Sequence, residues 1–118
     1  MISLQQVINI HSESIKRHGG MPGVKNKGLL ESAIISPQQG YIEDDVEIIS
    51  TIIYGICQNH PFNDGNKRTA FVVGKYLLNE IGKTLTMTND EYEKVILDLA
   101  GSKLSKDQLT EIIKKNIK

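Results

Sequence analysis

Apolar residues recur every three or four positions along most of this chain, a spacing that predicts helices rather than strands. The first helix is expected to begin after Ser3, which is followed three residues later by Gln6 in the spacing of a capping box. It should end before the sequence GGMPG, which starts at Gly19, because clustered Gly and Pro interrupt helices. A second, shorter helix should follow Asn26 and stop at Pro37.

The central part of the chain predicts a buried helix from about Asp45 to Gln58. Isoleucine and valine cover more than one stripe of this segment, as in helices that are packed on several sides. A run of β-branched residues can also form a strand, but the length of this run favours a helix. The preceding residues, 36–45, are expected to form an exposed connector or a small hairpin.

The C-terminal half predicts three further helices. One should begin near Asn66 and stop at Gly82, one should be capped by Asn89, and the last should follow a capping box at Ser105. Residues 83–88 could form a short strand. The pattern therefore predicts an all-α protein of about six helices, with a short connector or hairpin before the central helix, in a single domain over residues 1–118.

Charge and composition exclude several classes of function. The 118 residues carry 14 basic and 14 acidic side chains, so the net charge gives no reason to expect nonspecific binding to nucleic acid or to an anionic membrane. The sequence shows neither a signal peptide nor an apolar run long enough to span a membrane, and we expect a cytoplasmic protein. The single cysteine, Cys57, lies in an apolar helical pattern and is expected to be a buried core residue rather than a catalytic thiol.

The sequence NHPFNDGNKRTAF, which starts at Asn59, concentrates chemically active residues between two predicted helices. A helix that begins near Asn66 directs its unpaired N–H groups and the positive end of its dipole toward this loop. Gly65 allows close approach of a ligand to the backbone, while Lys67 and Arg68 add positive charge at the same point. Together these residues predict a phosphate site.

Two other residues of this loop extend the predicted chemistry. Asp64 would repel phosphate by itself, but its carboxylate suits Mg²⁺ that is also bound by phosphate oxygens. His60 can act as a general base on a hydroxyl placed beside that phosphate. Pro61 and Phe62 are expected to hold the loop in place, Pro61 by fixing φ and Phe62 by anchoring the turn in the core.

Each of these residues also has a plainer interpretation. His60 could simply end a helix, Asp64 and Gly65 could form a tight turn, and Lys67 and Arg68 could belong to a solvated helix face. Their joint occurrence in one loop favours the functional interpretation. His11 and His18 lie too far along the chain to be assigned to a zinc site and are expected to be structural or surface residues.

The sequence HPFNDGNKR, which starts at His60, resembles the signature of the Fic/Doc family. The upstream sequence HGGMPGVKNKGLLESAI, which starts at His18, is similar to the N-terminal half of the death-on-curing (Doc) toxins. The resemblance implies a Fic fold in which the motif loop and the following helix bind ATP. It implies that His60 deprotonates a target hydroxyl, that Asp64 holds Mg²⁺, and that Gly65, Asn66, Lys67 and Arg68 surround the phosphates. It further implies a target-binding flap at Gln38, Gln39, Gly40 and Tyr41, where a target segment would pair with the main chain.

Two residues differ from the AMP-transferring members of that family. Lys67 replaces a glycine, and Phe71 replaces a second arginine. Both differences are similar to Doc, and they imply transfer of the γ-phosphate to a threonine of the translation elongation factor Tu. An AMP-transferase that uses the same loop stays open as an alternative.

The resemblance also bears on regulation. Many Fic enzymes carry an inhibitory motif of Ser or Thr with Glu four residues later, and no Ser or Thr of this chain has Glu at that distance. The resemblance therefore implies inhibition by a partner antitoxin whose C-terminal segment folds against the toxin. A catalytically silent module that only binds an antitoxin is the third interpretation.

Overall fold

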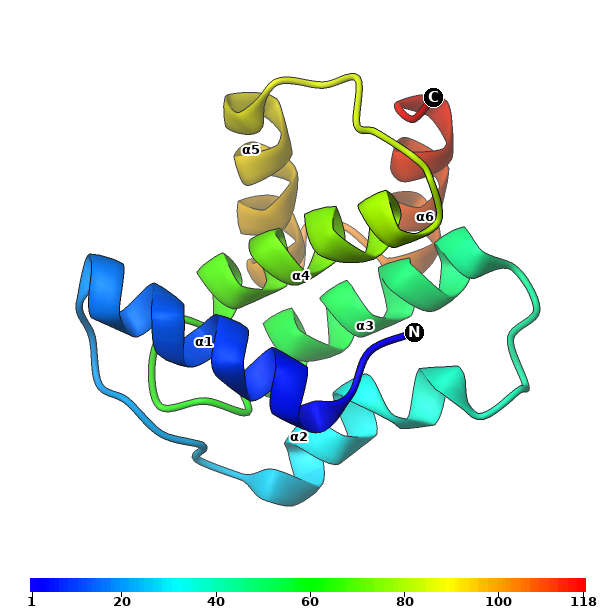
Figure 1. The fold of residues 1–118 in the computed structure, drawn as a ribbon. Helices are drawn as coiled ribbons and strands as arrows, with labels where there is room; N and C mark the ends of the chain where they lie inside the picture. The colour runs from blue at the N-terminus through cyan, green and yellow to red at the C-terminus, as the bar shows by residue number, and fades with distance from the viewer.

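The computed structural model describes all residues from 1 to 118, which form an all-α domain without a β-sheet (Figure 1). The elements are α1 (Leu4–His18), α2 (Lys27–Ile34), the 3₁₀ helix η1 (Ser36–Gln38), α3 (Asp45–Asn59), α4 (Asn66–Glu80), α5 (Asn89–Ala100) and α6 (Lys106–Lys115). The predicted fold class and the number of helices are confirmed. None of these helices is both long and apolar enough to cross a lipid bilayer.

Helix α3 lies at the centre of the fold and contacts α2, α4, α5 and α6. Its isoleucines at positions 49, 52, 53 and 56 are completely buried, which confirms a buried helix instead of a strand. Burial of one such side chain contributes roughly 1.5–3 kcal/mol. Helix α4 runs back along α3, and α1 crosses α4 near the point where α4 begins (Figure 1).

The predicted helix starts agree with the structure at five of the six positions named. Ser3 and Ser105 form capping boxes, and the Asn26 side chain accepts a hydrogen bond from the N–H of Leu29. The prediction for α5 is wrong by one residue, because its N-cap is Thr88. The Thr88 hydroxyl and the side chain of Glu91 form a reciprocal capping box, which satisfies two backbone donors at once.

Two segments for which the sequence allowed β-structure form no strand. Residues 83–88 form no strand and make only an isolated antiparallel bridge, between Leu85 and Ile117. The connector before α3 forms η1 and a bend, with no hairpin pairing. Pro37 lies inside η1, where its missing N–H needs no partner and its fixed φ suits the first turn.

Candidate functional site

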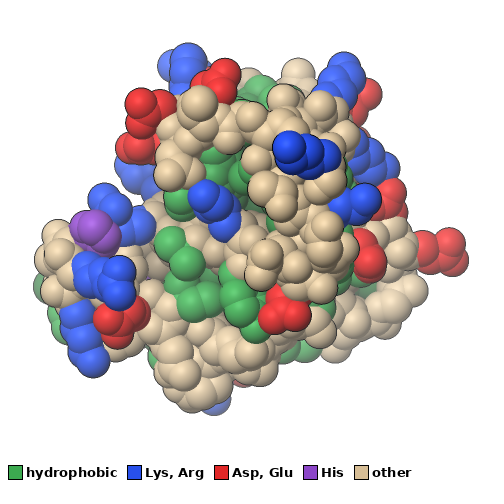
Figure 2. All heavy atoms as spheres, turned by 45° about the horizontal axis from the view of Figure 1, so that its top comes forward, with side chains coloured by type: hydrophobic (Ala, Val, Ile, Leu, Met, Phe, Trp, Pro, Cys, Tyr) green, Lys and Arg blue, Asp and Glu red, His purple; other side chains and the backbone are tan.

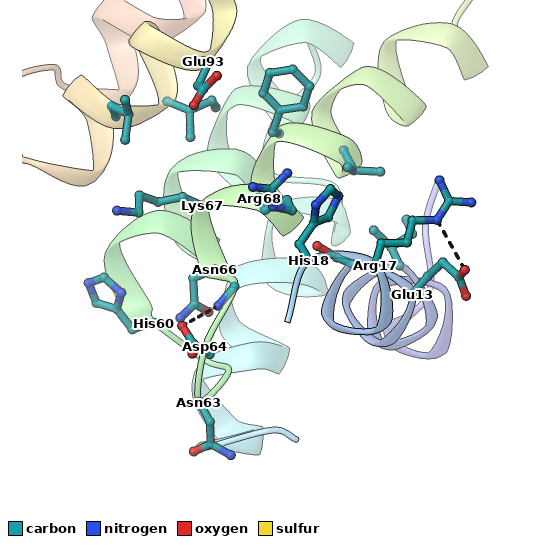
Figure 3. Close-up of a pocket in the computed structure, with 17 residues that line it drawn as sticks. Glu13, Arg17, His18, His60, Asn63, Asp64, Asn66, Lys67, Arg68 and Glu93 are labelled. Carbon is teal, nitrogen blue, oxygen red and sulfur yellow. Dashed lines mark hydrogen bonds and ion pairs between the residues drawn. The ribbon is translucent and has the colours of Figure 1, made fainter. Parts of the chain in front are cut away.

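The motif loop, residues 60–65, connects the end of α3 to the start of α4. His60 ends α3 in the left-handed backbone region, with φ 47° and ψ 56°, which few non-glycine residues adopt. Gly65 begins α4 from the same region, with φ 75° and ψ 20°. Because of these two residues the chain turns sharply twice, and His60 and the first turn of α4 border one cavity (Figure 3).

The first turn of α4 carries hydrogen-bond donors without partners. No side chain caps the helix, and the backbone N–H groups of Asn66, Lys67 and Arg68 donate no hydrogen bond within the protein. The side chains of Lys67 and Arg68 are exposed and form no ion pair. Three free N–H groups, the positive end of a helix dipole and two unpaired cations form a site that suits an anion.

The side chain of Asn66 makes two hydrogen bonds within the motif loop. Its Oδ1 accepts a hydrogen bond from the N–H of Phe62 at 3.0 Å, and its Nδ2 donates to the Phe62 carbonyl at 3.1 Å. Both ends of the amide therefore close the motif loop on itself. The backbone N–H of Asn66 stays free for an anion, so its predicted place beside the phosphates stays a prediction.

The segment 20–26 supports the motif loop from outside. Lys25 and Asn26 donate backbone hydrogen bonds to the Pro61 carbonyl at 2.8 and 3.1 Å, and Asn63 donates to the Gly23 carbonyl at 3.1 Å. Val24 and Phe62 thereby form an antiparallel bridge. The sequence predicts GGMPG as a turn, but the pairing of this segment with the motif loop was missed.

His11 supports the loop from inside, through a contact that the sequence does not indicate. It is buried on α1, and its Nε2 lies 2.8 Å from the carbonyl oxygen of Asp64. Its ring stacks on Phe62, with 3.8 Å between the ring centres and 6° between the planes. Phe62 itself is fully buried. The sequence places His11 with Leu4, Val7 and Ile15 on the apolar face of the first helix, and its burial follows from that pattern.

The Asp64 carboxylate is exposed at the base of the site and accepts two backbone hydrogen bonds, from Met21 and Gly65, each at 3.2 Å. Nowhere in the protein do three or more His, Cys, Asp or Glu side chains form a group that could hold a metal ion. This donor set does not suit zinc, which needs three or four protein ligands. It does suit Mg²⁺, which is commonly held by one or two carboxylates together with phosphate oxygens and water.

The cavity beside the loop has a volume of about 1020 Å³, which is enough for a ligand of nucleotide size. Its polar end is formed by the motif loop and the end of α1, where basic side chains and a histidine gather on the surface (Figure 2). Its other end is apolar and comes from α1, α4 and α5, with Ile10, Phe71, Val72, Ile96 and Leu97. Arg17, His18 and Glu93 also line it, and the sequence assigned none of them to a site.

The predicted flap residues lie elsewhere. Gln38–Tyr41 precede the N-terminal end of α3, whereas the motif loop follows its C-terminal end, about 22 Å away along a helix of 15 residues (Figure 1). None of the four residues lines the cavity. The Gln38 side chain bonds to the backbone N–H and carbonyl of Ile2 and to the Ile34 carbonyl, so it fastens the N-terminus to the end of α2. The structure thus places these residues away from the cavity, and their role as a target-binding flap stays a prediction.

Cys57 is fully buried in α3, as predicted. Burial raises the pKa of its thiol to about 12, because the thiolate would lose its hydration. The thiol therefore stays protonated at neutral pH and is not a candidate nucleophile.

Comparison with known proteins shows the family of this chain. A sequence model of the Fic/DOC family matches residues 1–78. The chain is also similar to the protein named "Protein kinase doc" of Escherichia phage P1, with 37% identity over 73 residues, which is 58% of each chain. The chain thus spans about 58% of the length of this curated relative.

Proposed function

This chain belongs to the Fic/DOC family, and from that premise we propose that it is a Doc-like toxin that transfers the γ-phosphate of ATP to a hydroxyl group of a protein. The target that we propose is a translation factor, elongation factor Tu, whose phosphorylation would stop translation. The observation that carries the proposal is the open start of α4 beside an exposed histidine. The similarity to a relative named a protein kinase adds support.

The triphosphate would bind at the first turn of α4. The free N–H groups of residues 66–68 would donate hydrogen bonds to its oxygens, and Lys67 and Arg68 would neutralise its charge. Gly65 leaves the backbone open to the ligand. The apolar end of the cavity, with Phe71 and Leu97, would receive the uncharged part of the nucleotide.

His60 is the proposed general base. Its ring is exposed on the cavity and has no hydrogen-bond partner in the protein, so it is free to accept a proton. The target hydroxyl would give its proton to His60 while its oxygen forms a bond to the γ-phosphorus. The bond from that phosphorus to the bridging oxygen would break, and ADP would leave with the electron pair.

Mg²⁺, when bound, would neutralise phosphate charge during transfer. Asp64 is the residue that would hold it. Hydrogen bonds from Met21 and Gly65 orient its carboxylate, and the exposed oxygens keep lone pairs for a cation.

The edge that we propose for the target is the segment around Val24 instead of Gln38–Tyr41. Residues 23 and 25 direct their hydrogen bonds toward the motif loop, whereas neither the N–H nor the carbonyl of Val24 has a backbone partner. An extended target segment could pair with Val24 from the open side and bring its hydroxyl to His60. The exposed side chains of Met21 and Leu29 offer apolar contacts to the same segment.

The choice of γ-phosphate over AMP transfer rests on Lys67. A glycine there would leave room for the α-phosphate beside the helix start, whereas the long lysine occupies that room and adds a charge. Inhibition by a partner antitoxin is part of the proposal, since this chain lacks the inhibitory motif of many Fic enzymes.

Two labelled forms of ATP test the function. The chain is incubated with Mg²⁺, elongation factor Tu or a cell extract, and ATP labelled on either the α- or the γ-phosphate. We expect only the γ label to reach protein, and His60→Ala to abolish this transfer while its thermal unfolding stays that of the wild type. Transfer of the α label would indicate an AMP-transferase. No transfer of either label by a folded chain would favour a silent module that binds an antitoxin.

A further inference from the structure

We infer that His11 is a positioning residue that sets the place of Asp64 and of the helix start behind it. This inference rests on the proposed function, because it concerns the same phosphate and metal site. His11 lies on α1, far from the motif in the sequence, and does not line the cavity. It therefore acts through the loop and not on the substrate.

The hydrogen bond between His11 and Asp64 has a defined direction. A carbonyl oxygen can only accept, so Nε2 must carry the proton and donate to the Asp64 carbonyl at 2.8 Å. The ring has little freedom to turn, because it is buried and lies parallel to Phe62 at 3.8 Å. The donor is thus fixed in position by an aromatic stack.

The position of Gly65 and of the start of α4 depends on the hydrogen bond between His11 and Asp64. Gly65 lies directly on α1, since a β-carbon there would be 3.7 Å from the His11 ring and 3.2 Å from Cδ1 of Ile15. The Asp64 carbonyl is held by α1, and its carboxylate is held by the N–H of Met21. With both groups fixed, the carboxylate and the free N–H groups of α4 keep a constant distance, as a shared metal and phosphate site requires.

Two substitutions test the N–H group and the aromatic ring of His11 independently. His11→Phe keeps the aromatic stack on Phe62 but removes the N–H group. His11→Gln removes the ring but can place an amide N–H at the same number of bonds from the backbone. If the hydrogen bond positions Asp64, the Gln variant should resemble the wild type and the Phe variant should not.

The first measurement is the Mg²⁺ concentration that gives half-maximal binding of ATP, determined by titration calorimetry on the full chain. We expect His11→Phe to raise it about tenfold, as is typical when a residue behind a metal ligand is lost. His11→Gln should stay within about threefold. In an Asp64→Asn background, His11→Phe should add no further Mg²⁺ requirement, because both substitutions act on one carboxylate.

The second measurement does not depend on ligand binding. In amide NMR spectra of the free protein, His11→Phe should shift the signals of residues 64–68 and leave those of α5 and α6 unchanged. His11→Gln should shift the loop signals much less. Equal shifts in the two variants would contradict a role for the N–H group.

The outcomes separate this inference from the proposed function. If wild type and both variants bind ATP with the same Mg²⁺ requirement, the role of His11 is wrong and the proposed function stands. If the wild type binds no ATP, the proposed function is wrong, and unshifted loop signals in His11→Phe would still overturn the role of His11. Unfolding of both variants would also overturn it, because His11 would then be needed by the whole fold.

Discussion

Gly65→Ala is the substitution whose effect follows most directly from the geometry of the helix start. Gly65 has φ 75°, a left-handed conformation that costs alanine roughly 1–2 kcal/mol. The added β-carbon would also lie 3.2 Å from Cδ1 of Ile15, closer than ordinary van der Waals contact, and 3.7 Å from His11. Strain in the backbone and crowding against α1 should therefore act together.

Gly82→Ala is the matched control at the other end of the same helix. Gly82 has φ 74°, almost the same as Gly65, but a β-carbon there would meet no atom within 4 Å. Gly82→Ala therefore measures the loss of stability that comes from the positive φ alone, without crowding. For a chain of 118 residues the entropy of unfolding is about 0.25 kcal/mol/K, so 1 kcal/mol lowers Tm by about 4 °C.

Thermal unfolding and ATP binding check this prediction together. We expect Gly82→Ala to lower Tm by about 4–8 °C and to leave ATP affinity unchanged. Gly65→Ala should lower Tm by about 4 °C more, because Ile15 must move, and should weaken ATP binding at least about tenfold. Equal losses of Tm in the two variants, with equal ATP affinity, would refute the proposed contact between the helix start, α1 and the nucleotide.

Three further predictions concern the metal, the core and the pH dependence. Asp64→Asn keeps the size and one acceptor of the side chain, so titration with Mg²⁺ should show that ATP binding needs a higher Mg²⁺ concentration, with the same Tm; an unchanged Mg²⁺ dependence would count against Asp64 as the ligand. Gly74→Ala should lower the free energy of unfolding by roughly 3 kcal/mol in urea, because its β-carbon would overlap the hydroxyl of Tyr92, and a neutral result would show that α5 can move away. The hydrogen bond from Lys114 lowers the pKa of Asp44, so this pair stabilises the fold above the ordinary pKa of a carboxyl group, and the contribution is lost as the pH falls through the lowered value. Lys114→Met should therefore flatten the acid side of the stability curve, and an identical curve for the variant would contradict this assignment.

The helices could be predicted from the sequence because their signals are local. The capping boxes at Ser3 and Ser105 each need only a residue three positions later, and the burial of α3 follows from the apolar residues of that helix alone. The cap of α5 was misplaced because Thr88 and Asn89 are adjacent residues that can both cap. Only the reciprocal bond to Glu91 decides between them.

The surroundings of the motif could not be predicted because they depend on contacts between distant segments. His11 and Asp64 are separated by 53 positions, and the apolar spacing of α1 does not reveal which loop its inward histidine meets. The pairing of Val24 with Phe62 is equally remote, and no local pattern in the sequence indicates it. The sequence also does not indicate that the side chain of Asn66 closes the motif loop by two hydrogen bonds to the backbone of Phe62.

The most direct test of the central claim is a titration of ¹⁵N-labelled protein with Mg²⁺ and ATP, followed by NMR of the backbone amides. We expect the N–H signals of Asn66, Lys67 and Arg68 to shift most, together with the ring signals of His60. Shifts that spare these signals and occur at the small cavity around Lys75 and Lys83 would contradict a nucleotide site at the start of α4.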